Sequence, residues 1–161
     1  GPAGATMVII NKDLLKKVKR NVPSMLSYKI HIEKDSSFNT PPVFPIYCIL
    51  LNLRLIKQEG IDNISKKNKI KSELIYSEID RNRCFSGFSE VSDRSQMNAT
   101  FNMNKGFDSE LFNRICADYN ISGINGHRSV GGYRASIYNA LPLESLNILI
   151  DAMKEFELSQ E

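Results

Sequence analysis

Two arginines and a histidine lie close together in residues 126–134, around a pair of glycines. The segment reads Gly-His-Arg-Ser-Val-Gly-Gly-Tyr-Arg and leads into an apolar run that is typical of a strand. A guanidinium group can hold a carboxylate or a phosphate through two parallel hydrogen bonds. The glycines allow the backbone to turn sharply and to approach a ligand closely. Arg128 and Arg134 could therefore converge on a small anion with two acidic ends, although a hairpin corner with solvated arginines explains the pattern equally well.

A second candidate segment begins at Ser37 and reads Ser-Phe-Asn-Thr-Pro-Pro-Val-Phe-Pro-Ile-Tyr. Thr40 is a suitable helix N-cap and Pro41 a suitable first helical residue, and capping alone would account for both. The alternative is an anion site, since the free amides and the dipole at a helix start attract negative charge. Because prolines supply no amide hydrogen, such an anion would be held mainly by the Asn39 amide and the Thr40 hydroxyl.

These two segments resemble the phosphoserine aminotransferases, class-V aminotransferases that use pyridoxal phosphate (PLP). Residues 126–140, followed by Leu-Pro-Leu-Glu, resemble the C-terminal signature of the family, and residues 37–47 resemble its cofactor-phosphate segment. Three further segments occur in the order expected for the family: Gly1-Pro-Ala-Gly4, Asp93–Asn98 and Met153–Phe156. The resemblance extends over nearly the whole chain.

The resemblance implies binding roles for five residues. Asn39 and Thr40 match the pair that reaches across a homodimer interface to the PLP phosphate of the other subunit. Arg134 matches the arginine that binds the α-carboxylate of the amino-acid substrate. His127 and Arg128 match the pair that helps to hold the distal phosphate or side-chain carboxylate, and a purely structural histidine remains the alternative for His127. The implied substrates are phosphoserine, glutamate and their keto acids.

The catalytic lysine of the family, to which PLP is attached, has no match in this chain. In the family that lysine precedes the segment matched by Gly1-Pro-Ala-Gly4, and the large domain around the cofactor ring also has no counterpart here. We therefore expect the C-terminal part of a PLP-dependent phosphoserine transaminase of serine biosynthesis. This part would contribute binding residues but no catalytic residue, and alone it would be inactive.

Composition limits the other possibilities. A chain of 161 residues with 42% hydrophobic and 24% charged residues is typical of a soluble globular protein. The net charge of +3 is small, and the lysines in residues 66–71 are more typical of a solvated helix face than of a nucleic-acid interface. No apolar run approaches the roughly 18 residues of a membrane span, and the N-terminus lacks a signal pattern. We expect neither a nucleic-acid nor a membrane partner.

The three cysteines are too far apart in the sequence for metal-ligand spacing, so no metal site is expected. Cys48 and Cys116 occur in apolar helical patterns, which predicts that both are core residues. An odd number of cysteines without a disulfide framework favours a reducing compartment, and we expect a cytoplasmic protein.

The hydrophobic pattern of the first 60 residues predicts one strand and several helices. Residues 5–10 form a β-branched run that predicts a buried strand, which would need a sheet completed elsewhere. A short helix capped by Asp13 follows, and residues 24–38 are predicted to be a loop that carries His31 at the surface. From about Phe44, apolar positions with helical spacing predict a helix with one buried face that ends at Gly60.

The pattern after residue 60 predicts an alternation of helices and strands. A helix is expected towards Asp80, with Ile64, Leu74, Ile75 and Ile79 facing inward. Strands are expected at 84–88, 98–103, 121–124 and 134–139, and helices at 109–119 and 142–158. This order predicts a small antiparallel or mixed sheet with helices on one face.

The fold class is therefore α/β, and the resemblance implies the α+β C-terminal domain of a fold-type I PLP-dependent transferase. Residues 1–60 would be the end of the large cofactor-binding domain and an interdomain helix, and residues 61–161 the small C-terminal domain. The alternative is a non-catalytic ferredoxin-like module that binds protein or nucleic acid. Its expected strands lack interleaved basic and aromatic residues, which argues against nucleic-acid binding.

Overall fold

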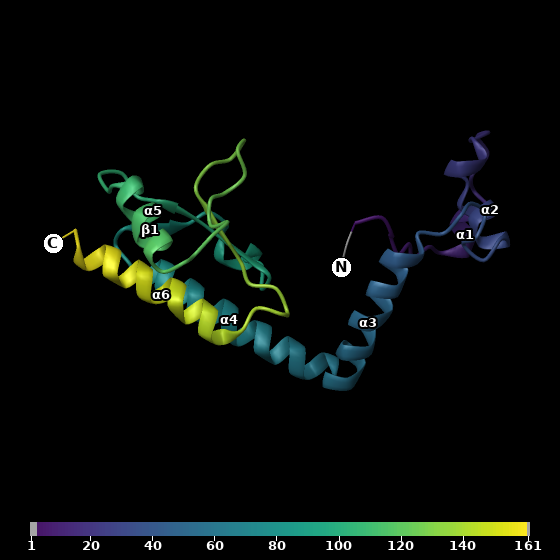
Figure 1. The fold of residues 1–161 in the computed structure, drawn as a ribbon. Helices are drawn as coiled ribbons and strands as arrows, with labels where there is room; N and C mark the ends of the chain where they lie inside the picture. The colour runs from purple at the N-terminus through teal and green to yellow at the C-terminus, as the bar shows by residue number, and fades with distance from the viewer. Residues whose placement is uncertain (1–2, 161) are drawn as a thin grey trace. The chain divides into compact units, whose positions relative to one another are not determined.

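The computed structural model describes residues 3–160, so the Gly1-Pro2 part of the first matching segment lies outside the described residues. The chain divides into two compact units, one ending at Glu59 and the other starting at Gly60, and each is described by itself (Figure 1). The assignment of these units to a large and a small domain stays a prediction.

The described residues of the first unit form three α-helices, α1 (Lys12–Leu15), α2 (Tyr28–Glu33) and α3 (Val43–Glu59), and a 3-10 helix at Ser24–Leu26. The cap of α1 is Asn11, whose side chain accepts the Asp13 N–H, so the predicted Asp13 cap was wrong by two residues. A second error concerns His31, which lies on α2 and not in a loop. Ser27, which was not predicted as a cap, caps this helix by accepting the Ile30 N–H.

Residues 5–10 do not form the predicted strand. They lie in extended or irregular backbone, and the side chain of Ile9 is 92% exposed. A strand requires a hydrogen-bonded neighbour, and no other strand is present in the described part of this unit. The prediction of a buried strand is therefore wrong for this chain.

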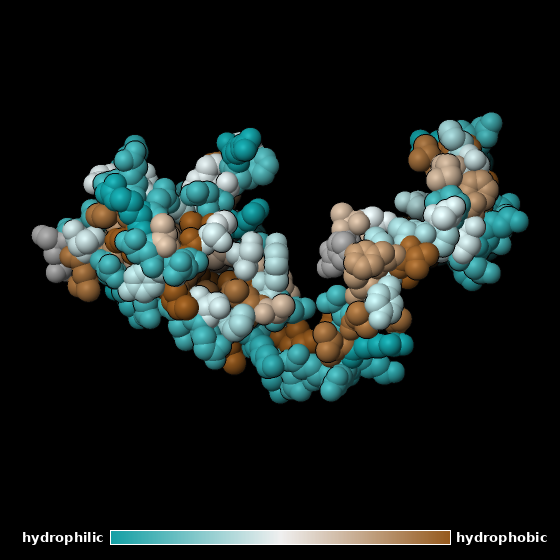
Figure 2. Space-filling model, viewed as in Figure 1, coloured by the Kyte–Doolittle hydropathy of each residue, from teal (hydrophilic) through white to brown (hydrophobic). Residues whose placement is uncertain are grey.

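Helix α3 ends at Glu59, directly before Gly60, as predicted, but it buries none of its residues. Figure 2 shows apolar side chains at the surface of this helix, and Ile46, Tyr47, Leu50 and Leu55 are all exposed. The predicted apolar stripe is therefore present but uncovered. Cys48, which was predicted to be a core residue, is only half-buried.

The described residues of the second unit form three α-helices, a 3-10 helix at Val91–Asp93 and a three-stranded sheet. The elements are α4 (Ile61–Arg81), β1 (Phe85–Gly87), β2 (Asn98–Met103), α5 (Ser109–Asp118), β3 (Tyr133–Ser136) and α6 (Leu143–Leu158). The sheet is antiparallel with the order β1-β2-β3. The predicted strand at 121–124 is absent; instead, Asn125 forms an isolated bridge with Tyr133.

The sheet has one buried face and one open face because side chains alternate along a strand. Ala99 and Phe101 of β2 and Tyr133 and Ala135 of β3 are buried in the core. Helices α4, α5 and α6 supply the other core residues, among them Ile75, Ile79, Phe112, Ile115, Leu146, Met153 and Phe156. Figure 1 shows α4 and α6 running along each other beneath the sheet. The side chains of Thr100, Asn102 and Arg134 lie on the opposite face of the sheet.

Two predictions for α4 were wrong. Leu74 is 39% exposed, and Lys71 is buried, although the lysines of residues 66–71 were expected on a solvated face. The Lys71 Nζ donates to the carbonyl oxygens of Tyr138 at 2.6 Å and Leu141 at 3.3 Å. Burial lowers the pKa of Lys71, and the nearby Lys67 lowers it further. Lys71 thus fastens the loop between β3 and α6 to α4.

The burial of the cysteines predicts their reactivity. Cys84 and Cys116 are buried, and burial raises the pKa of Cys116 to about 11, so thiolate formation is disfavoured at both sites. With a chromogenic disulfide reagent at pH 8, we expect one thiol per chain, Cys48, to react quickly in the native state. The other two thiols should react only after unfolding. Cys48→Ser should abolish the fast phase; a fast phase that persists in this variant would contradict the assignment.

No helix in residues 3–160 has the combination of length and apolar character needed to cross a bilayer. Within the same residues, no three His, Cys, Asp or Glu side chains are grouped so that they could hold a metal ion.

Candidate functional site

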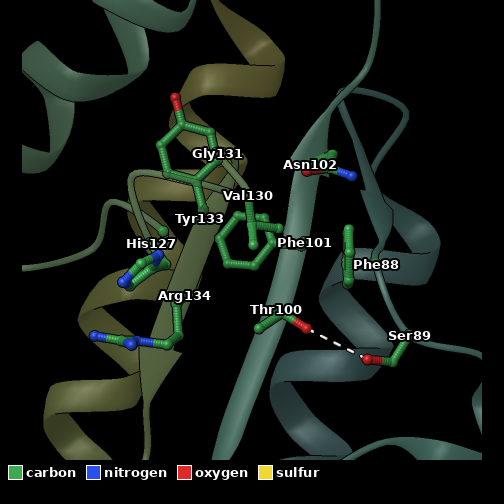
Figure 3. A pocket seen from close by; sticks show the side chains of 11 residues that line it. Phe88, Ser89, Thr100, Phe101, Asn102, His127, Val130, Gly131, Tyr133 and Arg134 are labelled. Atoms are coloured by element: carbon green, nitrogen blue, oxygen red, sulfur yellow. Dashed lines mark hydrogen bonds between the residues drawn. The ribbon is translucent and has the colours of Figure 1, made fainter.

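A hollow of about 350 Å³ lies against the open face of the sheet (Figure 3). Thr100 and Asn102 of β2 and Arg134 of β3 line it, together with His127 and Val130 of the loop that precedes β3 and with Phe88 and Ser89. Figure 3 shows His127 and Arg134 on the β3 side of the hollow, and Phe88 and Ser89 across β2 from them. The hollow therefore brings together two of the residues that the sequence analysis singled out.

Arg134 is held in place by backbone pairing on both sides of β3. It is the cross-strand partner of Thr100 on β2, and its N–H donates to the Ile124 carbonyl at 2.7 Å. Its two strand neighbours, Tyr133 and Ala135, are buried, so the Arg134 side chain is directed to the open face. The side chain is exposed and forms no ion pair with the described residues. Its guanidinium group is available to an external anion.

His127 is the first residue of a tight turn. Its carbonyl oxygen accepts the N–H groups of Val130 at 2.9 Å and Gly131 at 2.8 Å. The ends of the loop are joined by a hydrogen bond from the Gly126 N–H to the Gly132 carbonyl at 2.8 Å. A Cβ atom on Gly126 would collide with the Gly131 carbonyl oxygen, so this closure requires glycine. The loop thus fixes the position of the His127 backbone relative to β3.

Gly132 serves a purpose different from the one expected. Its φ is +65°, which glycine adopts readily, and a Cβ there would collide with the side chain of Asn102 on β2. The backbone at Gly132 therefore approaches strand β2 closely, whereas a close approach to a ligand was predicted for the glycine pair.

Arg128 lies at the tip of the turn and does not line the hollow. It is one of the two central residues of the turn that His127 begins, and it is exposed. The two arginines flanking the glycines are thus not brought into one cavity within this chain. The residue that shares the hollow with Arg134 is His127.

The wall opposite β3 is formed by the segment 88–97, which two residues of α4 hold in place. The Arg94 guanidinium donates to both carboxylate oxygens of Asp80, at 2.6 and 2.7 Å, and lies 4.6 Å from the centre of the Tyr76 ring. The Tyr76 hydroxyl is 3.2 Å from the carbonyl oxygens of Ser95 and Asn98. Phe88 closes the segment against β2 by donating its N–H to the Thr100 carbonyl at 3.0 Å.

The Asp80–Arg94 pair predicts a pH-dependent contribution to stability. The hydrogen bonds from Arg94 hold the pKa of Asp80 below its usual value. A lowered carboxyl pKa stabilises the folded state above the unfolded-state pKa, and this stabilisation disappears as the pH falls through the folded-state pKa. Because half of the Asp80 side chain is exposed, we expect Asp80→Asn to cost only about 1 kcal/mol at pH 7.

Urea unfolding at pH 7 and at pH 3 measures this effect. The difference between wild type and Asp80→Asn should be present at pH 7 and should shrink towards zero in acid. Asp151→Asn is a matched control, since Asp151 is exposed on α6 and lies 3.9 Å from Lys154. An equal destabilisation by Asp80→Asn at both pH values would show that the ion pair is not the cause.

Asn39 and Thr40 lie in the first unit, directly before α3, and both are exposed. The helix begins at Val43, and the Pro42 carbonyl accepts the first helical hydrogen bond, from the Ile46 N–H at 3.1 Å. Thr40 is therefore not the helix cap, and the prediction of a cap at this position was wrong. Pro45 is tolerated because the first N–H groups of a helix have no partner within it. The Asn39 side chain donates to the Thr40 carbonyl at 3.3 Å.

Several residues of the hollow were not singled out from the sequence. Phe88, Ser89, Thr100, Asn102 and Val130 have ordinary residue types with no motif of their own. The available signal was the alternation in residues 98–103, which places Thr100 and Asn102 on the face opposite to the buried Phe101. Ser89 could not be found this way, because its contact with Thr100, at 3.5 Å between the hydroxyl oxygens, depends on the path of the segment 88–97.

Comparison with known proteins identifies the family. The family described as aminotransferase class-V matches residues 1–149. Phosphoserine aminotransferase from Flavobacterium psychrophilum is 55% identical over 98% of this chain and 44% of its own length. The corresponding enzyme from Bacteroides thetaiotaomicron is 51% identical over 97% of this chain and 45% of its own length.

Solved structures give the same result. Phosphoserine aminotransferase from Bacillus circulans subsp. alkalophilus matches with a TM-score of 0.85 and 36% identity, over 93% of this chain and 42% of that chain. PLP-bound phosphoserine aminotransferase from Trichomonas vaginalis matches with a TM-score of 0.82 and 35% identity, over 90% of this chain and 42% of that chain. The chain thus spans less than half the length of the relatives that it matches, and the resemblance seen in its motifs is confirmed. It belongs to the class-V aminotransferase family.

Proposed function

We propose that this chain is part of a phosphoserine transaminase that uses PLP. The complete enzyme would reversibly transfer an amino group between glutamate and 3-phosphohydroxypyruvate, forming O-phosphoserine for serine biosynthesis. The observation that carries the proposal is the hollow on the open face of the sheet, where His127 and the unpaired Arg134 lie together. The family relationship adds the chemistry that such an anion-binding site would serve.

Arg134 suits the α-carboxylate of the amino-acid substrate. Its planar fork can donate two parallel hydrogen bonds to a carboxylate, and strand β3 holds its backbone rigidly. Binding this carboxylate fixes one end of the substrate and so orients its amino group. Phe88 and Val130 add apolar surface to the same hollow.

His127 and Arg128 suit the distal phosphate or side-chain carboxylate. A phosphate offers acceptor oxygens to both an imidazole N–H and a guanidinium group. Arg128 lies outside the hollow of its own chain, at the exposed tip of the turn. We therefore propose that it completes the distal anion site near or across the interface of a homodimer.

Asn39 and Thr40 are proposed to hold the PLP phosphate. Because Thr40 does not cap α3, its hydroxyl is available to a ligand, and both side chains are exposed. Few backbone amides can assist, since Pro41, Pro42 and Pro45 have no N–H. When bound, PLP supplies the electron sink that makes transfer of the amino group possible. The residues of this chain contribute binding and orientation.

We also propose which domain of the complete enzyme each part of the chain belongs to. Residues 1–60 would belong to the end of the large domain of a fold-type I transferase and residues 61–161 to its small domain. The exposed apolar side chains of α3 would then be covered by other parts of a longer, dimeric, cytoplasmic enzyme. Because no lysine here matches the catalytic one, the 161-residue chain alone should not transaminate.

The alternative of a ferredoxin-like binding module has little support. That fold has a four-stranded sheet with a split β-α-β arrangement. The sheet in the described residues has three strands in sequential antiparallel order. The proposal of a transaminase is therefore preferred.

A substrate comparison tests the proposed function. The full-length protein that carries this sequence, loaded with PLP, would be assayed with 2-oxoglutarate and either O-phosphoserine or L-serine. We expect kcat/KM for O-phosphoserine to be at least about 100-fold higher, because only the phosphorylated substrate uses the distal anion site. Equal efficiency with both amino acids, or no transamination of either, would contradict the proposal.

A further inference from the structure

The imidazole ring of His127 is held by a residue of its own turn. The Ser129 hydroxyl oxygen is 2.7 Å from the His127 Nδ1, and the Ser129 backbone N–H donates to the same nitrogen at 3.3 Å. A backbone N–H can only donate, so Nδ1 must be an acceptor that carries no proton. A neutral imidazole has one ring proton, which must therefore be on Nε2.

The turn holds this contact in a defined geometry. Ser129 is the third residue of the turn that His127 begins, and the turn is closed by two hydrogen bonds to the His127 carbonyl. The collision that a side chain at Gly126 would cause keeps the ends of the loop together. The serine side chain is short, so little rotamer entropy is lost when its hydroxyl is fixed.

We infer that Ser129 is a positioning residue that fixes His127 as an Nε2–H donor for an anion in the hollow. The inference rests on the proposed function only where it names that anion as the phosphate of the substrate. The opposite tautomer would present a lone pair at Nε2, which would repel the oxygens of a fully ionised phosphate. Ser129 therefore favours ligands whose oxygens only accept hydrogen bonds, as phosphate monoesters and carboxylates do.

The tautomer can be measured directly on this chain. Two-bond ¹H–¹⁵N spectra of the histidine-labelled protein, at an alkaline pH where free imidazole is neutral, distinguish the two ring nitrogens. We expect His127 to carry its proton on Nε2 in the wild type. In Ser129→Ala only the longer contact from the backbone N–H, at 3.3 Å, remains, so the fraction of the Nδ1–H form should rise above that of the wild type. His31 is the internal reference, since its Nε2 contacts the Met25 carbonyl at 2.9 Å. A wild-type His127 with its proton on Nδ1 would overturn the inference whatever the protein binds.

Kinetics of the full-length holoenzyme test the consequence for binding. Ser129→Ala should raise KM for O-phosphoserine about threefold to tenfold and leave kcat nearly unchanged, because one hydrogen bond that orients the donor is lost. KM for L-serine should not change, and Ser129→Thr, which keeps the hydroxyl, should restore the wild-type KM. Ser122→Ala controls for removal of an exposed serine outside the hollow.

The outcomes separate the two claims. A Ser129→Ala variant with unchanged KM for O-phosphoserine, or with KM raised equally for L-serine, would overturn the role of Ser129 and leave the proposed function standing. A wild-type enzyme without any preference for the phosphorylated substrate would contradict the proposed function, while the tautomer spectrum would still decide the role of Ser129.

Discussion

Replacing Arg134 by glutamine in the full-length holoenzyme should lower kcat/KM for O-phosphoserine and for glutamate by about 10²–10³-fold. Two charge-assisted hydrogen bonds to the α-carboxylate would be lost, each worth about 1.5–3 kcal/mol, and part of that loss is recovered from water. The decrease in kcat/KM should be similar for the two substrates because both contain the α-carboxylate. Arg134→Lys keeps the charge but not the planar fork, so it should recover only part of the activity.

Stability should not explain the loss of activity. Arg134 is exposed and forms no ion pair with the described residues, and its backbone pairing with β2 does not depend on its side chain. Arg134→Gln should therefore unfold at nearly the wild-type urea concentration. Arg114→Gln is the matched control, since Arg114 is an exposed arginine on α5 whose ion pair with Asp108 is 3.9 Å long. If Arg134→Gln and Arg114→Gln had equal kcat/KM, the proposed role of Arg134 would be wrong.

The second large effect is expected from Phe112→Ala, which should destabilise the protein by about 3–5 kcal/mol. Phe112 is fully buried on α5 and lies at the centre of an aromatic cluster. Its ring centre is 4.9 Å from that of Phe85, 5.1 Å from that of Tyr133 and 5.3 Å from that of Phe156. The loss is a large fraction of the 5–15 kcal/mol that typically stabilises a domain. Urea unfolding followed by far-ultraviolet circular dichroism measures it.

A matched control is available on the surface of the same unit. Phe88→Ala removes an identical side chain, but Phe88 is 57% exposed, so this variant should cost well under 1 kcal/mol. Phe112 also supports the site, because Tyr133 in its cluster directly precedes Arg134. Equal destabilisation by the two variants would show that the aromatic cluster is not the main core of the unit.

The elements of the second unit could be predicted because their periodicity is strong and local. The helix predicted at 142–158 is α6, which buries the stripe of Leu146, Leu149, Ile150, Met153 and Phe156, and the strand predicted at 98–103 is β2. In such elements the apolar spacing and the final packing impose the same pattern.

The errors arise where packing with other elements decides the structure. Residues 5–10 have the composition of a strand, but without a neighbouring strand they cannot form one. The apolar face of α3 was identified correctly, yet nothing in the described part of its unit covers it. Lys71 occurs among solvated lysines in the sequence, and only the fold shows that the carbonyls of Tyr138 and Leu141 reach it.

The candidate site was predicted only in part, because some of its residues are placed by local features and others by packing with distant elements. The Gly-rich loop is a local feature, so the sequence indicated an anion site within residues 126–134. The predicted convergence of Arg128 and Arg134 is not found, because His127 and not Arg128 shares the hollow with Arg134. The direction of Arg128 depends on the type of turn, which leaves it at the exposed tip. The wall formed by Phe88 and Ser89 depends on the Asp80–Arg94 pair, which joins residues from two different elements. No pattern along the chain predicts that pair.

A crystal structure of the full-length holoenzyme with O-phosphoserine bound would test the central claim most directly. The account predicts that the carboxylate of the ligand accepts two hydrogen bonds from the Arg134 guanidinium. It also predicts that the phosphate accepts a hydrogen bond from the Nε2–H of His127. A ligand bound with both acidic ends away from the hollow of Thr100, His127 and Arg134 would contradict it.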